Sequence, residues 1–142
     1  VAFAGVLAMN PDVLVLDEPA AGLDPAGRKE IFEYALQLKK MGKTIILVSH
    51  NMNEAAKYAD RLLVLSSGVA HGPMTPKELF EQEDYARSLG IAQVELVSCL
   101  KECSRIFPGI ETCVFSVSEA ADILIRAAYS RNVSEKGCGA DD

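Results

Sequence analysis

The sequence has no apolar stretch long enough to cross a lipid bilayer. Its longest one, Val1–Met9 with Gly5 inside it, falls far short of the ~20 residues that a spanning helix needs. No basic segment precedes this stretch, so it does not predict a signal peptide. Basic residues are also few: 14 Lys and Arg stand against 20 Asp and Glu, which gives a net charge of −6. Because an acidic surface binds phosphate backbones poorly, we expect no nucleic acid partner.

The four cysteines do not form a pattern that holds zinc. Cys99, Cys103, Cys113 and Cys138 follow no standard zinc spacing, and neither histidine lies near them. With 142 residues, 49% of them hydrophobic, the chain can form a core without disulfides. The sequence therefore predicts reduced thiols in a cytosolic protein, with Cys103 on the apolar side of a helix.

The sequence also lacks a loop that could cradle phosphate groups. Gly42-Lys43-Thr44 matches the end of such a loop, but the first glycine of the motif would fall at position 37, which is Gln37. The triplet follows a predicted helix and opens a strand, whereas a phosphate loop follows a strand and opens a helix. The chain begins at Val1 within an apolar helical pattern that has no capping residue before it, so we expect a piece of a longer protein.

What the sequence does contain is an alternation of strands and helices. Three short apolar runs predict strands buried on both faces: Val13–Leu16, Thr44–Val48 and Arg61–Leu65. A helix is predicted from Pro25, capped by Asp24 and ended by Gly42, and a shorter one over Met52–Ala59. This rhythm is typical of a parallel α/β sheet.

Beyond Gly68 the pattern changes from strands to helices. We expect Val69–Met74 to be a turn-rich connection, and the capping box Thr75–Glu78 opens a helix. From about Tyr85 onward the chain is predicted to be all-helical, with a last helix that begins after Ser116. One apolar stripe is expected to face the core: Leu96, Leu100, Cys103 and Phe107.

Polar side chains follow two of the predicted strands at the point where each strand ends. Asp17 and Glu18 come directly after Val13–Leu16, and His50 closes the segment after Thr44–Val48. The carboxyl ends of parallel strands form the crevice where α/β proteins bind ligands. Two acids there suit nucleotide hydrolysis, one to hold Mg²⁺ and one to polarise the attacking water, and an imidazole can bond a γ-phosphate oxygen.

Several segments together resemble the ATP-binding cassette ATPases. Val13–Pro19 (VLVLDEP) resembles the Walker B strand, Ala21–Pro25 (AGLDP) the D-loop and Ile46–His50 (ILVSH) the H-switch of that family. Val1–Met9 is similar to the helix that follows the family's LSGGQ signature, and Gly72–Phe80 to its G-x-P-x-E-x-F segment with one residue inserted. The AGLDP form is most similar to the ATPases of energy-coupling-factor uptake transporters of the cobalt and vitamin type.

The resemblance implies roles for four residues, with ATP and Mg²⁺ as cofactors. Asp17 corresponds to the acid that holds Mg²⁺ through water, and Glu18 to the catalytic glutamate. Asp24 corresponds to the D-loop aspartate at the dimer interface, and His50 to the histidine that contacts the γ-phosphate. The sequence departs from the family in lacking the Walker A, Q-loop and signature segments, and Ala20 stands where Thr or Ser is usual.

We therefore predict an α/β chain in three parts. Residues 1–82 are expected to be the C-terminal half of an ATP-binding cassette ATPase domain, residues 83–133 a helical C-terminal extension, and residues 134–142 a disordered tail. The predicted function is the ATPase subunit of an energy-coupling-factor transporter for a small micronutrient, at the cytoplasmic face of the cell membrane. Its expected partners are a second ATPase subunit, identical or different, a transmembrane coupling subunit and a substrate-binding membrane subunit.

Other functions are compatible with the same motifs. One is the ATPase subunit of another importer of the superfamily, and a second is a soluble cassette ATPase that acts on DNA or ribosomes, which the acidic composition disfavours. A non-catalytic module that kept the fold is disfavoured by Glu18. The sequence does not identify the transported substrate. We expect the 142-residue chain alone to be unstable and inactive, because the family's Walker A strand, which completes the sheet, is missing.

Overall fold

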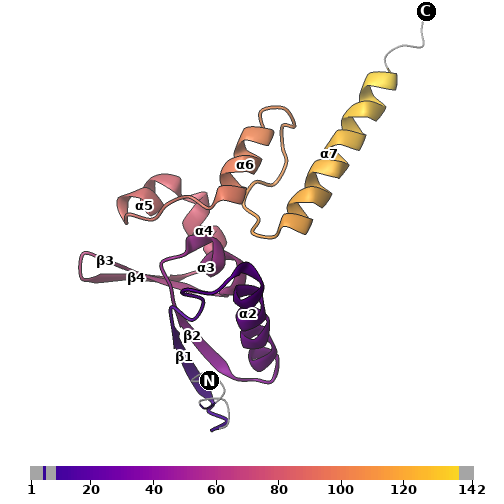
Figure 1. The fold of residues 1–142 in the computed structure, drawn as a ribbon. Coiled ribbons are helices and arrows are strands. Elements are labelled where there is room, and N and C mark those ends of the chain that lie inside the picture. The colour runs from indigo at the N-terminus through magenta and orange to yellow at the C-terminus, as the bar shows by residue number, and fades with distance from the viewer. Residues whose placement is uncertain (1–4, 6–8, 138–142) are drawn as a thin grey trace, which may run out of the picture. The chain divides into compact units, whose positions relative to one another are not determined.

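The computed structural model describes residue 5 and residues 9–137, and the chain forms two compact units (Figure 1). Unit 1 is Val1–Asn51 and unit 2 is Met52–Asp142. The boundary expected between residues 82 and 83 thus falls inside unit 2. The helix expected over Val1–Met9 lies, apart from residues 5 and 9, outside the described residues.

Unit 1 is a strand–helix–strand motif. It contains β1 (Val13–Asp17), α2 (Pro25–Lys40) and β2 (Thr44–Val48). The two strands run parallel, with Asp17 paired in register with Val48 at their carboxyl ends. This confirms the parallel α/β arrangement that the sequence predicts for these elements.

The sheet of unit 1 is buried on one face only. Leu14 and Leu16 are buried, as is Phe32 of α2, which packs against the sheet. The alternate side chains of β1, Val13 and Val15, are 53% and 61% exposed. The prediction that β1 is buried on both faces is therefore wrong for this chain, because one helix covers one face and no described element of unit 1 covers the other.

The start and end of α2 follow the local sequence signals. The Asp24 carboxylate accepts a hydrogen bond from the Gly27 N–H at 2.8 Å, and Pro25 stands at the first helical position. Gly42 has φ +86°, the left-handed conformation that ends a helix. These observations confirm the predicted caps.

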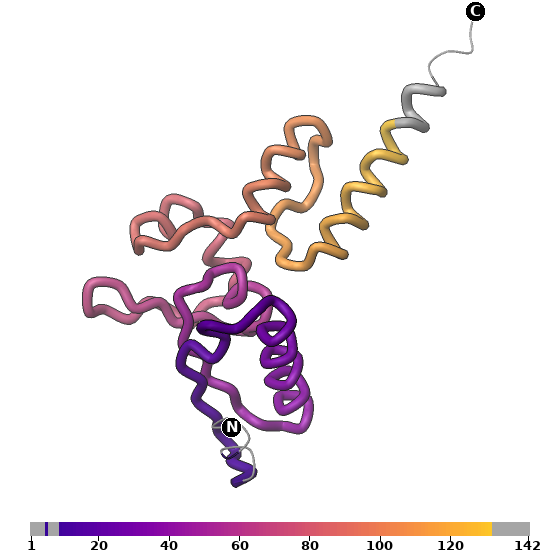
Figure 2. Tube along the Cα trace, viewed as in Figure 1, coloured from indigo at the N-terminus to yellow at the C-terminus, as the bar shows by residue number. Residues whose placement is uncertain are grey.

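Over its described residues, 52–137, unit 2 combines a two-stranded hairpin with five helices. Figure 2 traces the path of the chain. The elements of unit 2 in order are α3 (Met52–Tyr58), β3 (Leu62–Ser66), β4 (Val69–Met74), α4 (Pro76–Glu81), α5 (Glu83–Ser88), α6 (Glu95–Cys103) and α7 (Val117–Gly137). The connection from α6 to α7 contains turns and irregular backbone, so the expectation of an all-helical region after Tyr85 is wrong there.

The third predicted strand pairs differently from the prediction. β3 does not join β1 and β2 but pairs antiparallel with β4, the segment expected to be a turn-rich connection. Ser67 and Gly68 between them both have positive φ, 51° and 77°, which is the backbone of a tight two-residue hairpin turn. This turn brings β4 back along β3, which accounts for the antiparallel sheet.

The core of unit 2 forms around α4. Leu79 and Phe80 are fully buried, and the Phe80 ring lies 5.8 Å from that of Phe115. The Thr75 hydroxyl accepts from the Glu78 N–H, and the Glu78 carboxylate accepts from the Thr75 N–H, so the predicted capping box is confirmed. The main cluster draws residues from the helices, strands and loops on both sides of residue 82: Ala56, Val64, Leu79, Phe80, Ala86, Val94, Val97 and Cys113. This core is therefore shared by residues on both sides of residue 82.

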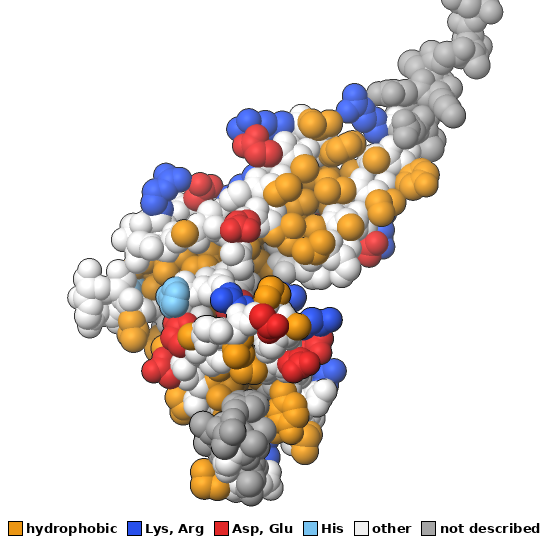
Figure 3. All heavy atoms as spheres, viewed as in Figure 1, with side chains coloured by type: hydrophobic (Ala, Val, Ile, Leu, Met, Phe, Trp, Pro, Cys, Tyr) orange, Lys and Arg blue, Asp and Glu red, His pale blue; other side chains and the backbone are white. Residues whose placement is uncertain are grey.

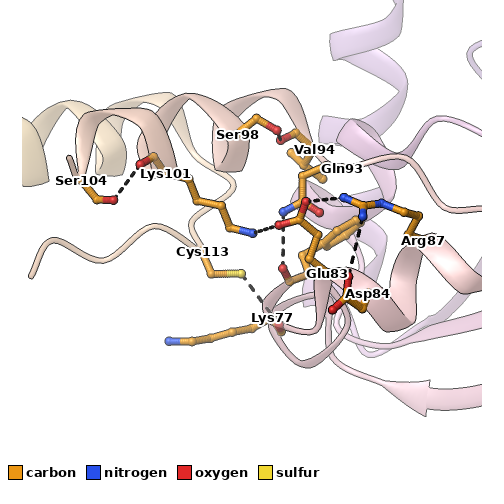
Figure 4. A network of polar contacts seen from close by, with 11 residues as sticks. Lys77, Glu83, Asp84, Arg87, Gln93, Val94, Ser98, Lys101, Ser104 and Cys113 are labelled. Carbon is orange, nitrogen blue, oxygen red and sulfur yellow. Dashed lines mark hydrogen bonds and ion pairs between the residues drawn. The ribbon is translucent and has the colours of Figure 1, made fainter.

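Ion pairs and polar contacts join α5 and α6 at the edge of this core (Figure 4). The Glu83 carboxylate accepts from Lys101 Nζ and from Arg87 Nη2, each at 2.9 Å. Cys113 Sγ donates to the Lys77 carbonyl oxygen at 3.8 Å. Burial raises the pKa of the Cys113 thiol, so this cysteine stays protonated at neutral pH.

The end of the chain differs in two places from the expected pattern. α6 ends at Cys103, which is half-buried, so Phe107 lies beyond the helix and does not share its stripe with Leu100. α7 continues to Gly137, so residues 134–137 are helical, where a disordered tail was expected from residue 134. The rest of that tail lies outside the described residues.

Candidate functional site

The candidate site lies at the carboxyl edge of the β1–β2 sheet in unit 1. Asp17 ends β1 and Val48 ends β2, and the two residues are partners in the parallel register. Glu18 follows the first strand directly, and His50 stands two residues beyond the second. The Glu18 N–H donates to the Val48 carbonyl oxygen at 2.9 Å, which extends the strand pairing by one residue. This backbone hydrogen bond therefore fixes the position of the Glu18 Cα at the end of β1.

Glu18 and His50 are in direct contact. A single carboxylate oxygen, Glu18 Oε1, accepts from the His50 backbone N–H at 2.8 Å and lies 2.6 Å from His50 Nδ1. An ionised carboxylate only accepts hydrogen bonds, so Nδ1 carries the proton in this contact. The Glu18 side chain is 35% exposed and the His50 side chain 88% exposed. The imidazole can therefore be reached from solvent while one of its nitrogens is held.

The backbone of Glu18 has an unusual conformation. Its φ is +44°, in the left-handed region that residues with a side chain adopt at an energetic cost. Directly after it, the Ala21 N–H donates to the Glu18 carbonyl oxygen at 3.0 Å and closes a tight turn. Strained backbone of this kind gathers at functional sites.

The contact with His50 holds the pKa of the Glu18 carboxyl below its ordinary value. The largest cause is the hydrogen bond from the His50 side chain, and the bond from the His50 backbone N–H acts in the same direction. Partial desolvation acts against both. Because the pKa is lowered, this contact stabilises the folded state at pH values above the pKa that Glu18 has in the unfolded chain. The stabilisation is lost as the pH falls through the pKa of Glu18 in the folded state. Glu18 is thus an ionised acceptor at neutral pH.

The two aspartates predicted for the site have different surroundings. Asp17 is exposed at the end of β1, next to the Glu18–His50 contact in the sequence. The Asp24 carboxylate caps α2 by accepting a hydrogen bond from the Gly27 N–H. The family resemblance assigns a role at the dimer interface to the same carboxylate. The structure therefore brings Glu18 and His50 together and gives Asp24 a structural contact.

A bound Mg²⁺ ion would have few protein ligands here. In the part of the chain that the structure describes, no group of three or more His, Cys, Asp or Glu side chains could hold a metal ion. Magnesium commonly keeps several waters and binds through one or two carboxylates together with substrate phosphates. The exposed Asp17 fits that mode, in which the phosphates supply the remaining ligands.

Ser49 is a site residue to which sequence reasoning assigned no role. Its hydroxyl oxygen accepts a hydrogen bond from the Asn51 N–H at 3.1 Å. This short-range bond shapes the turn that carries His50, between β2 and α3. The signal in the sequence is the Ser-x-Asn spacing itself, which is common in turns and therefore weak.

Comparison with known proteins relates the chain to a transporter family. No protein-family model matches it. It is 46% identical over 124 residues to the energy-coupling factor transporter ATP-binding protein EcfA2 of Bacillus licheniformis, over 85% of this chain and 43% of the relative. It is 39% identical to the EcfA2 protein of Clostridium perfringens, over 93% of this chain and 47% of that protein. The chain is related to the ATP-binding proteins of energy-coupling factor transporters.

A solved structure supports the same relationship to these ATP-binding proteins. It is cbiO1 of Clostridium perfringens, described as part of the ABC transporter complex cbiONQ, with a TM-score of 0.50 and 40% identity. The match covers 63% of this chain and 36% of cbiO1. These findings confirm the predicted family resemblance and the α/β fold. The chain spans about half the length of the curated relatives it matches.

The relationship to energy-coupling factor ATP-binding proteins leaves the roles of single residues as predictions. The structure establishes the contact between Glu18 and His50, whereas the catalytic roles of both, and the roles of Asp17 and Asp24, come from the motif resemblance. Among the described residues, no helix is long and apolar enough to cross a membrane.

Proposed function

We propose that the chain is part of the ATP-hydrolysing subunit of an energy-coupling-factor type ABC uptake transporter, here called the whole subunit. This subunit couples ATP binding and hydrolysis to the transport of a small micronutrient. The observation that carries the proposal is the contact of Glu18 with His50 at the carboxyl edge of a parallel strand pair. The names of the curated relatives, which are ATP-binding proteins of energy-coupling factor transporters, support it.

In this proposal Glu18 is the catalytic glutamate. Its Oε1 is engaged by His50, so we assign Oε2 to the attacking water. The lowered pKa keeps the carboxylate ionised, which is the form that can orient a water and accept its proton. Holding one oxygen in place fixes the direction of the other, and position matters more than basicity in phosphoryl transfer.

His50 contacts the γ-phosphate of ATP in the same proposal. With Nδ1 bonded to Glu18, the nitrogen left for a phosphate is Nε2. A phosphate oxygen accepts hydrogen bonds, so Nε2 has to carry a proton as well, and the imidazole is then a cation. The Glu18 carboxylate beside it balances that charge, as the aspartate does for the histidine of a serine protease triad. The two residues therefore act as a pair.

Asp17 and Asp24 complete the proposed set. Asp17 would hold Mg²⁺, largely through water, and the ion would neutralise charge on the phosphates. Asp24 would face a second ATP-binding subunit through the D-loop while it caps α2. The other proposed partners are a transmembrane coupling subunit and a substrate-binding membrane subunit, which place the protein at the cytoplasmic face of the membrane.

The test uses the whole subunit, expressed together with the membrane proteins encoded beside it. We expect Mg-ATP-dependent phosphate release from the purified complex, and loss of this release in the Glu18→Gln variant. We also expect the coding sequence upstream of Val1 to contain a G-x-x-x-x-G-K-[ST] loop and an LSGGQ segment. A complex without ATPase activity, or a coding sequence without either motif, would overturn the proposal.

A further inference from the structure

The helix α6 carries two cysteines on one side, here called the thiol pair. Cys99 and Cys103 stand four residues apart within this helix, so their side chains are neighbours on the same face, one turn apart. Cys99 is exposed and Cys103 is half-buried. The candidate site lies in unit 1, so the proposed hydrolysis uses neither thiol. The pair is a set of two nucleophiles that the proposed function does not explain.

Hydrogen bonds hold the backbone around the thiol pair. The Cys103 carbonyl oxygen accepts from the N–H groups of Ile106 and Phe107, at 3.0 and 2.9 Å. The Ser104 N–H donates to the Leu100 carbonyl oxygen at 2.8 Å, so the helical bonding continues past Cys103. Regular helix therefore presents both cysteines, and helix geometry sets the separation of their thiols.

This separation limits what the thiol pair can bind. Cβ atoms four residues apart on a helix lie ~5–6 Å from each other. A disulfide needs Cβ atoms ~3.5–4.5 Å apart, so a direct sulfur–sulfur bond would require the helix to deform. Structural zinc takes four ligands, and among the residues that the structure describes no group of three or more His, Cys, Asp or Glu could hold a metal ion. The pair therefore suits an atom that bridges two sulfurs and needs no further protein ligand.

The surroundings of the thiol pair disfavour negative charge. Burial raises the pKa of the Cys103 thiol, and the neighbouring Cys99 and Glu102 raise it further. Leu96 and Leu100 of the same helix pack in an apolar cluster with side chains of α7. In Figure 3 hydrophobic side chains gather at the surface over the part of unit 2 that contains α6 and α7. An uncharged bridged product is therefore favoured over a charged complex of two thiolates, such as the one that copper(I) forms.

We propose that Cys99 and Cys103 form a binding site for trivalent arsenic, supplied as an organic arsenoxide, R–As=O. Each thiol gives its proton to the arsenoxide oxygen, which leaves as water, and two S–As bonds replace the As=O bond. Arsenic stays trivalent, so the step needs no oxidant or reductant. The product is a neutral bridge across one turn of α6. The inference concerns ligand binding in unit 2, and it does not depend on ATP hydrolysis.

The test uses the whole subunit, reduced and then freed of reductant, with phenylarsine oxide as the probe. An excess of 2-mercaptoethanol is added afterwards, because this monothiol displaces arsenic from a single protein thiol far more readily than from two. We expect Cys99 and Cys103 to keep the arsenical and to escape a later alkylation. Trypsin cuts after Lys101, so in the unfolded digest the arsenical should join the fragments Ser88–Lys101 and Glu102–Arg105. Alkylation of both cysteines, or an arsenical that joins other fragments only, would overturn the proposal.

Variants separate the thiol pair from its single thiols. Cys99→Ser and Cys103→Ser should each weaken retention of the arsenical by ~10²-fold or more, because the remaining thiol binds alone. Cys113→Ser, a matched control at a buried cysteine outside α6, should retain it. The double variant Ser98→Cys, Cys99→Ser keeps two thiols but places them five residues apart, on different sides of the helix, and should lose it.

Undiminished retention in either single variant or in the double variant would overturn the proposal, because neither a second thiol nor its place on the helix would then matter. The joined fragments are measured on the unsubstituted subunit, so they decide the question even where a variant fails to fold. Both measurements are made without ATP. A subunit that hydrolyses no ATP but keeps the arsenical on the pair would therefore overturn the proposed function and leave this inference intact.

Discussion

The sharpest prediction concerns the replacement of Glu18 by glutamine in the whole subunit. The amide oxygen can still accept from the His50 backbone N–H and from Nδ1, now 2.8 and 2.6 Å from Oε1, so the shape of the site is kept. The second oxygen becomes an NH₂ group, which cannot accept a proton from water. Loss of a positioned general base costs ~10²–10⁴-fold in rate, and we expect turnover to fall within that range.

The assay measures phosphate release at saturating Mg-ATP, with ATP affinity determined separately by calorimetric titration. We expect the affinity of the Glu18→Gln variant to stay close to that of the wild type, because the change removes a proton acceptor and no phosphate contact. The matched control is Glu30→Gln, the same chemical change at an exposed position on α2, which should turn over normally.

Either of two results would refute the reasoning. If Glu18→Gln releases phosphate within about threefold of the wild-type rate, well short of the expected loss, Glu18 is not the base. A loss of turnover that is matched by an equal loss of ATP affinity would also refute it, because Glu18 would then act in binding.

The remaining predictions concern pH, capping, the thiols and the isolated chain. His50→Ala removes the main cause of the lowered Glu18 pKa. The acidic limb of the pH–rate profile of the remaining activity should therefore move to higher pH, and a limb that stays in place would contradict the contact between Glu18 and His50. Asp24→Ala should lower thermal stability by about 1 kcal/mol through loss of the α2 cap, whereas Asp24→Ser should retain most of it. Ser in place of Cys99 and Cys103 should cost stability more than turnover, and stoichiometric zinc in chelator-free protein would contradict the prediction of free thiols. The isolated 142-residue chain should unfold at low urea and show no ATP binding by calorimetry, and micromolar binding would show that a segment here replaces the phosphate loop.

The elements that the sequence predicts well are those with local signals. The caps of α2 and α4 follow from Asp24 and Thr75, whose side chains bond backbone groups three residues away. β1 and β2 follow from short apolar runs joined by a helix, and such a connection produces parallel pairing. Each of these signals, a capping residue or a short apolar run, lies within a short segment of the sequence.

The elements that the sequence does not predict depend on contacts between distant residues. β4 contains Gly72 and Pro73, which are poor strand formers, and it is a strand because β3 pairs with it. The end of α6 at Cys103 is set by the turns that follow, and not by an apolar stripe that continues in the sequence to Phe107. Contacts between residues that lie far apart in the sequence cannot be predicted from the spacing of its apolar residues.

The candidate site divides in the same way. That Glu18 and His50 share one edge of the sheet follows from two strands that end in polar residues, which the sequence makes visible. Their direct bond does not follow, because it needs the left-handed backbone at Glu18 and the turn held by Ser49. Both are features of the folded chain that residue types alone do not specify.

The double hydrogen bond at Glu18 Oε1 also makes the site observable without any turnover. The His50 amide proton points at an oxygen whose charge disappears when the carboxyl is protonated, so its chemical shift follows the ionisation of Glu18. A single backbone resonance would then report the charge state of the Glu18 carboxylate in a titration of the ¹⁵N-labelled whole subunit. The same resonance can be followed in variants that do not hydrolyse ATP, for which kinetic assays give no information.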